Sequence, residues 1–224
     1  MIFAVLNQKG GVGKTTLTLN LAAALLERQP SRSLALLDLD DQESLFRYRR
    51  VAKGKDGDKS FKNAEFFSVA LADLPHQLER LRGEFDHVLM DAPRSLDDEL
   101  CAALFRLCDG ALVPMIPEYD ALLAAKRTMK VVEAIGAEKM KRGQPNLRAR
   151  VVISQNSNAP HRAKIKKAAR ELFEEKLLRT LVPSASAVGL AAFEGQSVLF
   201  SSPKSSAANA FRRLALEIEH AWWI

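Results

Sequence analysis

The sequence predicts an α/β protein with a mostly parallel central sheet and helices on both faces of that sheet. Five short apolar runs, rich in β-branched residues or leucine, alternate with stretches of helical periodicity. The runs are continuously apolar, which is typical of strands buried on both faces. Polar segments follow three of these runs directly. Because ligands bind at the carboxyl ends of parallel strands, we expect the functional residues in those segments.

Each expected strand is followed by an expected helix. The strands are 2–6, 34–39, 87–91, 111–116 and 150–154, and the helices begin at Lys14, Glu43, Leu96, Tyr119 and His161. Residues 52–63 are polar and rich in Gly and Lys, which predicts a surface loop. No linker of Gly, Ser or Pro divides the 224 residues. We therefore expect residues 1–224 to form a single domain with one substantial core.

Composition argues against several classes of protein. A hydrophobic content of 47% with 27% charged residues is ordinary for a globular chain, which argues against a disordered or fibrous protein. No apolar run approaches the roughly 18 residues of a membrane helix. The N-terminal run has no basic residue before it, so it predicts a buried strand rather than a signal peptide, and we expect a cytoplasmic protein. Cys101 and Cys108 are expected to be reduced core thiols in the helix after residue 91.

The positive charge of the chain is local. Residues 126–179 contain 15 Lys/Arg and 5 Glu, a charge of +10, whereas the whole chain carries +6 and the remainder therefore −4. Such asymmetry can indicate a nucleic-acid-binding face, but solvated Lys and Arg side chains on ordinary helices also explain many such segments. Charge alone leaves both interpretations open.

A glycine-rich turn with two lysines lies between the first expected strand and its helix. It comprises Lys9, Gly10, Gly11, Val12, Gly13, Lys14, Thr15 and Thr16. Glycines let successive backbone N–H groups point at phosphate oxygens, and the helix N-terminus adds its positive dipole. Lys14 can reach the β- and γ-phosphates, and the Thr15 hydroxyl can bind Mg²⁺. The turn therefore predicts a P-loop NTPase that binds ATP and Mg²⁺, and an ordinary strand-to-helix turn is the weaker interpretation.

The turn differs from the generic phosphate-binding pattern, which has glycine where this chain has Gln8. The order K-G-G-x-G-K-T-[ST] resembles the deviant Walker A motif of the ParA/MinD family of ATPases. This resemblance implies that Lys9 reaches across a nucleotide-sandwich homodimer to the ATP of the partner. A cation supplied in trans neutralises charge on the transferring phosphoryl group, so hydrolysis would depend on dimerisation. A solvated surface lysine is the alternative for Lys9.

Three aspartates follow expected strands. Asp38 and Asp40 flank Leu39, so strand alternation would place both on one side if the strand persists that far. The segment resembles the D-x-D-P-Q of ParA proteins, with Asp41 where proline is common. The resemblance implies that Asp38 lies near the Mg²⁺ water shell and that Asp40 orients the attacking water. Asp91 ends an apolar run in the Walker B arrangement and is implied to hold Mg²⁺ through water, although a strand-ending aspartate can also cap a helix.

The resemblance continues more loosely over the second half of the chain. By position it implies that Ser154, Gln155 and Pro183 lie near the adenine base. Many relatives have Asn or Thr at the first of these positions and Arg or Lys at the second, so the chain departs from the family at Ser154 and Gln155.

Partition proteins of the ParA type bind DNA without sequence preference as ATP-bound dimers, which requires basic side chains against phosphates. The resemblance implies such contacts at Arg179 and Lys204. The basic stretch 161–170 adds candidates at Lys164, Lys166 and Lys167, and a solvated helix face is the alternative for these three. We expect a cytoplasmic, nucleoid-associated ATPase.

The chain resembles the short ParA type, because its first expected strand begins at residue 2 and no helix-turn-helix region precedes it. A ParB-like protein or a cargo adaptor is the implied partner, and it would stimulate slow ATP hydrolysis. The cargo can be a plasmid, a chromosome region or another cellular assembly.

The main alternative is a MinD-like membrane ATPase. Such a protein would end in a basic amphipathic helix, but segment 211–224 mixes two Arg with two Glu. Trp222 and Trp223 suit either helix packing or a membrane interface. An iron–sulfur member of the family is disfavoured because the chain has no Cys-x-x-Cys. A small-molecule kinase or ligase is disfavoured because no acceptor-binding motif is present.

Overall fold

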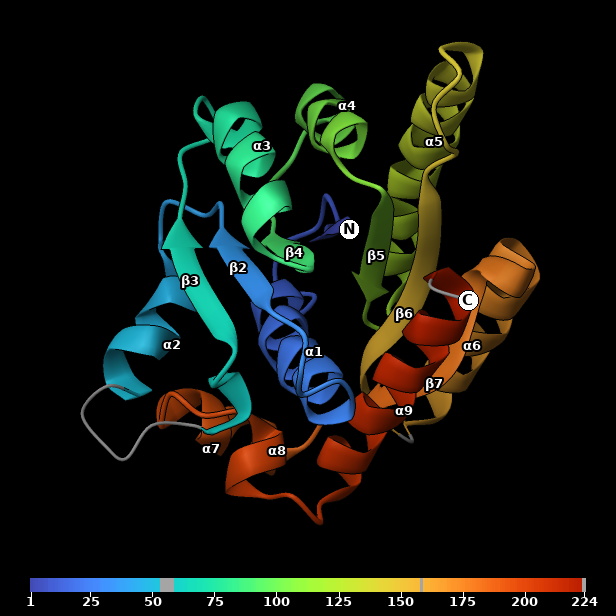
Figure 1. The fold of residues 1–224 in the computed structure, drawn as a ribbon. Helices are drawn as coiled ribbons and strands as arrows, with labels where there is room; N and C mark the ends of the chain where they lie inside the picture. The colour runs from blue at the N-terminus through green and yellow to red at the C-terminus, as the bar shows by residue number, and fades with distance from the viewer. Residues whose placement is uncertain (53–58, 158, 223–224) are drawn as a thin grey trace.

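The computed structural model describes residues 1–52, 59–157 and 159–222. Its centre is a seven-stranded sheet with the strand order β3-β2-β4-β1-β5-β6-β7 (Figure 1). Every neighbouring pair of strands is parallel. The predicted α/β fold class is confirmed, and the described sheet is parallel throughout rather than mostly parallel.

The strands are β1 (Ile2–Val5), β2 (Leu34–Asp38), β3 (Ala64–Ser68), β4 (His87–Asp91), β5 (Gly110–Met115), β6 (Arg148–Asn156) and β7 (Leu177–Pro183). The α-helices are α1 (Lys14–Arg28), α2 (Ser44–Ala52), α3 (Leu74–Glu84), α4 (Asp98–Leu107), α5 (Tyr119–Lys141), α6 (Pro160–Phe173), α7 (Ser186–Phe193), α8 (Val198–Ser201) and α9 (Ser206–Trp222). The 3₁₀ helices are η1 (Lys59–Phe61) and η2 (Glu174–Lys176). All five expected strands are present, and each expected helix begins within two residues of its predicted start.

The sheet separates two apolar cores. Helices α3, α4, α5 and α6 cover one face, while α1, α2, α7, α8 and α9 cover the other. Strand β1 contributes to both, since Ile2 and Ala4 point to the first core and Phe3 and Val5 to the second. This explains why the inner strands are continuously apolar in the sequence.

The loop expected at 52–63 is described only in part. Residues 53–58 lie outside the described residues. Residues Lys59–Phe61 form η1, and Phe61 is buried with its ring centroid 5.4 Å from that of Phe66. The expectation of a polar surface loop is therefore wrong for Phe61, which anchors the segment to the core before β3.

The C-terminal helix α9 is packed on the sheet. Its apolar residues Leu214, Ile218 and Trp222 are buried, and the Trp222 ring centroid lies 5.4 Å from that of Phe3. Trp222 is thus a packing anchor, while Trp223 lies outside the described residues. No helix in the described ranges combines the length and the apolar character needed to cross a membrane.

Both cysteines are buried free thiols, as expected. Cys101 lies within α4, whereas Cys108 is the residue directly after the last residue of that helix. The expectation that both belong to one helix is therefore wrong for Cys108, whose thiol donates to the Leu104 carbonyl at 2.8 Å.

Candidate nucleotide and magnesium site

The turn between β1 and α1 is shaped by its glycines. Gly11 and Gly13 have φ angles of +76° and +85°, in the left-handed region that favours glycine. In the described structure no side chain caps the N-terminus of α1, which begins directly after Gly13. Its free N–H groups and positive dipole therefore face the turn, together with the first-turn residues Thr15 and Thr16. Val12 is buried and fastens the turn to the core.

Asn7 anchors the turn to the neighbouring strand β5. This residue is fully buried, and its Nδ2 donates to the Pro114 carbonyl at 2.7 Å. Its Oδ1 accepts a hydrogen bond from the Lys9 backbone N–H at 2.9 Å. Sequence reasoning missed Asn7, although a polar residue at the end of an apolar strand was a usable signal. It also missed Thr128 of α5, whose hydroxyl oxygen accepts from the backbone N–H of Gln8 at 3.4 Å.

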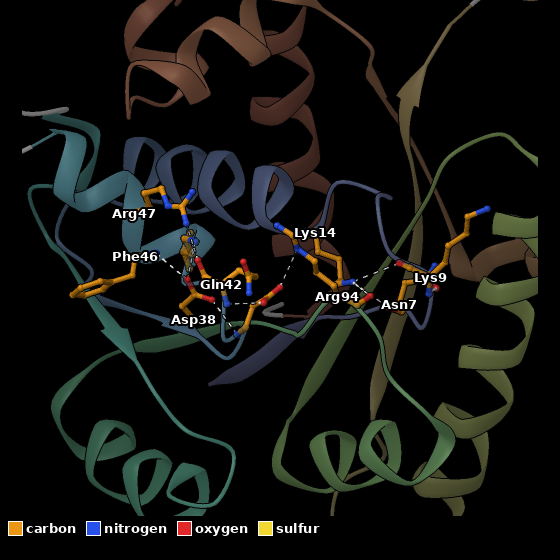
Figure 2. Close-up of polar contacts among 10 residues, drawn as sticks. Asn7, Lys9, Lys14, Asp38, Gln42, Phe46, Arg47 and Arg94 are labelled. Atoms are coloured by element: carbon orange, nitrogen blue, oxygen red, sulfur yellow. Dashed lines mark hydrogen bonds and ion pairs between the residues drawn. The ribbon is translucent and has the colours of Figure 1, made fainter.

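Lys14 is buried, and its ammonium group points at backbone carbonyls (Figure 2). Its Nζ lies 3.1 Å from the carbonyl oxygen of Arg94, 3.4 Å from that of Asn7 and 3.5 Å from that of Lys9. Burial lowers the pKa of Lys14, and the charge of Asp91 opposes this shift. A buried cation whose hydrogen bonds go to neutral carbonyl oxygens is well suited to receive an anion.

Lys9 extends away from Lys14, as Figure 2 shows. Its Nζ lies 4.0 Å from Asp120 Oδ2, and the two side chains are 29% and 82% exposed. An ion pair this long and this exposed holds the lysine only weakly. The two lysines of the turn thus differ in direction and in restraint.

Asp38 is the last residue of β2 and is buried. Its carboxylate accepts backbone hydrogen bonds from Asp40 at 3.1 Å, Leu45 at 2.7 Å and Phe46 at 2.9 Å. Burial raises the pKa of Asp38, and these hydrogen bonds oppose the rise. Because the strand ends here, the alternation that would have placed Asp38 and Asp40 on one side does not apply. Asp38 instead holds the start of α2 against the carboxyl end of β2.

Asp40 lies in a turn closed by a hydrogen bond of 2.8 Å from the Glu43 N–H to the Asp40 carbonyl. Its Oδ1 accepts from the Gln42 N–H at 2.9 Å, and its Oδ2 lies 3.6 Å from Arg94 Nε. Asp41, at the position where proline is common in ParA proteins, is exposed. Hydrogen bonds from the backbone N–H groups of Glu43 and Gln42 therefore brace this loop in place of a proline ring.

Asp91 ends β4 and lies beside Asp38 in the register of β2 and β4. It is completely buried, and its Oδ1 accepts from the Thr18 hydroxyl at 3.3 Å. Its Oδ2 has no hydrogen-bond partner among the described residues. Burial raises the pKa of Asp91 to about 7, and the hydroxyl of Thr15 opposes the rise.

The donor set fits a magnesium ion bound together with a nucleotide. A divalent cation near the unpartnered Asp91 oxygen would favour the ionised carboxylate that burial otherwise disfavours. Mg²⁺ typically takes only one or two protein carboxylates and fills its other positions with water and phosphate oxygens. Thr15 and Asp38 are the further oxygen donors beside Asp91.

A cavity of about 200 Å³ opens beside the turn and is lined by Ser154, Gln155 and Pro183 among others. The Ser154 hydroxyl donates to the Val12 carbonyl at 2.8 Å, and Gln155 Nε2 donates to the Gly11 carbonyl at 3.1 Å. The structure thus brings all three predicted base-site residues next to the turn. Two of them hydrogen-bond the turn itself.

The predicted DNA-contacting residues lie on three parts of the fold. Lys164, Lys166 and Lys167 belong to α6 and Arg179 to the neighbouring strand β7, while Lys204 lies between α8 and α9. All are exposed except the half-buried Lys166, whose Nζ donates to Asn156 Oδ1 at 3.1 Å. The structure therefore brings the α6 lysines and Arg179 to adjoining elements, with Lys204 on a separate turn.

A parallel α/β sheet with a glycine-rich turn, a buried lysine at the helix start and a strand-ending aspartate defines a P-loop nucleotide-binding protein. Residues 3–198 match the CobQ/CobB/MinD/ParA nucleotide binding domain, and the chain belongs to this family of P-loop ATPases.

Known relatives agree with this assignment. The chain is 31% identical, over 96% of its length and 94% of the relative, to chromosome-partitioning ATPase Soj of Thermus thermophilus. It is 30% identical to maintenance of carboxysome distribution protein A of Halothiobacillus neapolitanus, with 68% of this chain and 65% of that protein matched. The septum site-determining protein MinD of Pyrococcus horikoshii, solved with Mg-ADP, has the same fold, with a TM-score of 0.72, 20% identity and coverage of 97% and 95%.

Proposed function

We propose that this chain is an ATP-driven dimerisation switch that partitions DNA or positions a cellular cargo. The observation that carries this proposal is the opposed arrangement of the two lysines in one turn. Lys14 points inward at acceptors that phosphate oxygens can replace, while Lys9 extends away from the site of its own chain. The relatives named for chromosome partitioning and carboxysome distribution support this class of activity.

In this proposal residues 1–224 act as a single ATPase domain. The glycine-rich turn and Lys14 hold the phosphates. Thr15, Asp38 and Asp91 hold Mg²⁺ directly or through water, and the ion neutralises phosphate charge. Asp40 positions the attacking water. The cavity at Ser154, Gln155 and Pro183 receives the adenine base.

Lys9→Ala is expected to leave the affinity for Mg·ATP within about threefold of the wild type, because the Lys9 side chain extends away from Lys14. The variant should lose the ATP-dependent dimer, since a cation in trans is the contact that links the two nucleotide sites. Light scattering during gel filtration with a non-hydrolysable ATP analogue measures this.

Asp120→Ala is the matched control, because it removes the ion-pair partner of Lys9 and keeps the lysine. It should dimerise as the wild type does. Normal dimerisation and DNA binding by the Lys9 variant would contradict the proposed role in trans.

DNA binding in this proposal is electrostatic and follows dimerisation. The support is the +10 charge of residues 126–179 and the exposure of Lys164, Lys167, Arg179 and Lys204. Basic side chains against phosphates suffice for binding without sequence preference, and such binding weakens steeply with salt. A ParB-like protein or a cargo adaptor then stimulates hydrolysis, after which the dimer separates from DNA.

A MinD-like attachment to membranes is the alternative. The described part of α9 opposes it, because Leu214, Ile218 and Trp222 are buried in the core and are not available to lipid. Gel shifts on plasmid-length DNA and flotation with anionic vesicles, each with ATP and with ADP, separate the two functions. We expect an ATP-dependent, salt-sensitive shift and no flotation. Flotation without a shift would overturn the proposal.

A further inference from the structure

Arg94 connects the phosphate-binding turn to the loop that carries Asp40. Its carbonyl oxygen accepts from Lys14 Nζ at 3.1 Å and lies 3.5 Å from the point where a Cβ on Gly10 would stand. Its guanidinium Nε lies 3.6 Å from Asp40 Oδ2. One residue thus touches both groups that are proposed to act on the terminal phosphate.

We propose that Arg94 is a γ-phosphate-binding residue, whose guanidinium exchanges the Asp40 carboxylate for the terminal phosphate when ATP binds. The site would thereby distinguish ATP from ADP within one chain. This inference rests on the proposed ATPase function. It adds a positive charge from the same chain, Arg94, to the one that Lys9 of the partner subunit is proposed to supply.

The exposure of the two partners supports the exchange. The Arg94 side chain is 68% exposed, whereas that of Asp40 is 10% exposed. An ion pair in which one partner is this exposed, with a separation of 3.6 Å, adds little to stability and is readily given up. A guanidinium presents its N–H donors in a planar fork that matches phosphate oxygens, so a terminal phosphate is the stronger partner.

The hydrogen bonds of Asp40 give the exchange a consequence for hydrolysis. In this structure Oδ1 accepts from the Gln42 N–H and Oδ2 faces Arg94, so each carboxylate oxygen already has a partner. Departure of the guanidinium leaves Oδ2 free to accept a hydrogen bond from water. With ADP, no terminal phosphate competes and the pair between Arg94 and Asp40 persists.

The backbone of Arg94 couples the same event to Lys14. When the Lys14 ammonium moves to phosphate oxygens, the Arg94 carbonyl loses its hydrogen bond from Nζ. The segment after β4 is then less restrained on the side of the turn. The neighbouring cations Arg47 and Arg50 are placed differently, because Arg47 donates to the Gln42 carbonyl at 3.3 Å and Arg50 pairs with Glu43 at 3.4 Å.

The test compares the affinities of Arg94→Ala for Mg·ADP and for Mg²⁺ with a non-hydrolysable ATP analogue, by competition with a fluorescent nucleotide. We expect the affinity for Mg·ADP to stay within about twofold of the wild type. The affinity for the ATP analogue should fall about tenfold, because one charged hydrogen bond is lost. Arg94→Lys, which keeps the positive charge, should restore part of the difference. Equal changes for both nucleotides, no change, or no restoration by lysine would overturn the inference.

Arg80→Ala is the matched control, because Arg80 on α3 pairs with Glu84 at 2.8 Å, away from the turn. It should change neither affinity. Retained ADP affinity in Arg94→Ala also shows that the variant is folded. If the wild type itself binds no Mg·ATP, the proposed function fails. If the wild type binds both nucleotides and Arg94→Ala keeps their affinity ratio, only the role of Arg94 fails.

Discussion

Lys14→Ala is expected to lower the affinity for Mg·ATP by at least about a hundredfold, because about two charged hydrogen bonds to phosphate are lost. Within the described ranges, the buried ammonium group at the start of α1 donates only to the backbone carbonyls of Asn7, Lys9 and Arg94. Isothermal titration calorimetry with Mg·ATP and Mg·ADP measures the loss. Both nucleotides should be affected, unlike in Arg94→Ala.

The same substitution is not expected to destabilise the nucleotide-free protein. Burial lowers the pKa of Lys14, so the folded state disfavours the charge that the side chain carries at neutral pH. Lys14→Ala should therefore unfold at the same temperature as the wild type or at a higher one, as is common for substitutions of residues kept for function. Lys126→Ala on the exposed side of α5 is the control and should bind nucleotide normally. Nucleotide binding by Lys14→Ala at wild-type strength would reject the proposed phosphate site.

The inner strands of the fold could be predicted because burial on both faces makes them continuously apolar. The edge strands β3 and β7 could not, because one side of each is solvated. Only Ala64 of β3 is fully buried, and in β7 buried and exposed residues alternate around Arg179 and Thr180. Such short, mixed segments resemble loops in a sequence, and pairing with β2 and β6 decides their conformation.

The site was predictable where spacing along the chain determines the chemistry, as in the turn around Lys14. Contacts between distant segments were not. Asp91 at the end of β4 meets Thr18 of α1 because β4 and β1 are neighbours in the sheet. Arg94, which follows β4, reaches Asp40, which follows β2, because β2 and β4 are also neighbours. The role of Asp38 also depended on where β2 ends. Its carboxylate caps backbone N–H groups of α2, which a strand pattern does not reveal.

Asp40→Ala is expected to slow ATP hydrolysis by about a hundredfold or more, the usual effect of removing a group that orients or deprotonates the nucleophile. The variant keeps Lys9 and Lys14, so it should still bind Mg·ATP and dimerise. It should therefore accumulate as an ATP-bound dimer that stays on DNA. Phosphate release and gel shifts followed over time measure both effects, with the exposed neighbour Asp41→Ala as the control.

The substitution also separates catalysis from the exchange proposed for Arg94. Without Asp40 the guanidinium has no competing carboxylate, so the affinity of Asp40→Ala for an ATP analogue should equal or exceed that of the wild type. Combining Arg94→Ala with Asp40→Ala should remove this gain while hydrolysis remains slow. A fall in analogue affinity in the single Asp40 variant would contradict the exchange, because it would mean that the carboxylate supports nucleotide binding instead of competing with the phosphate for Arg94.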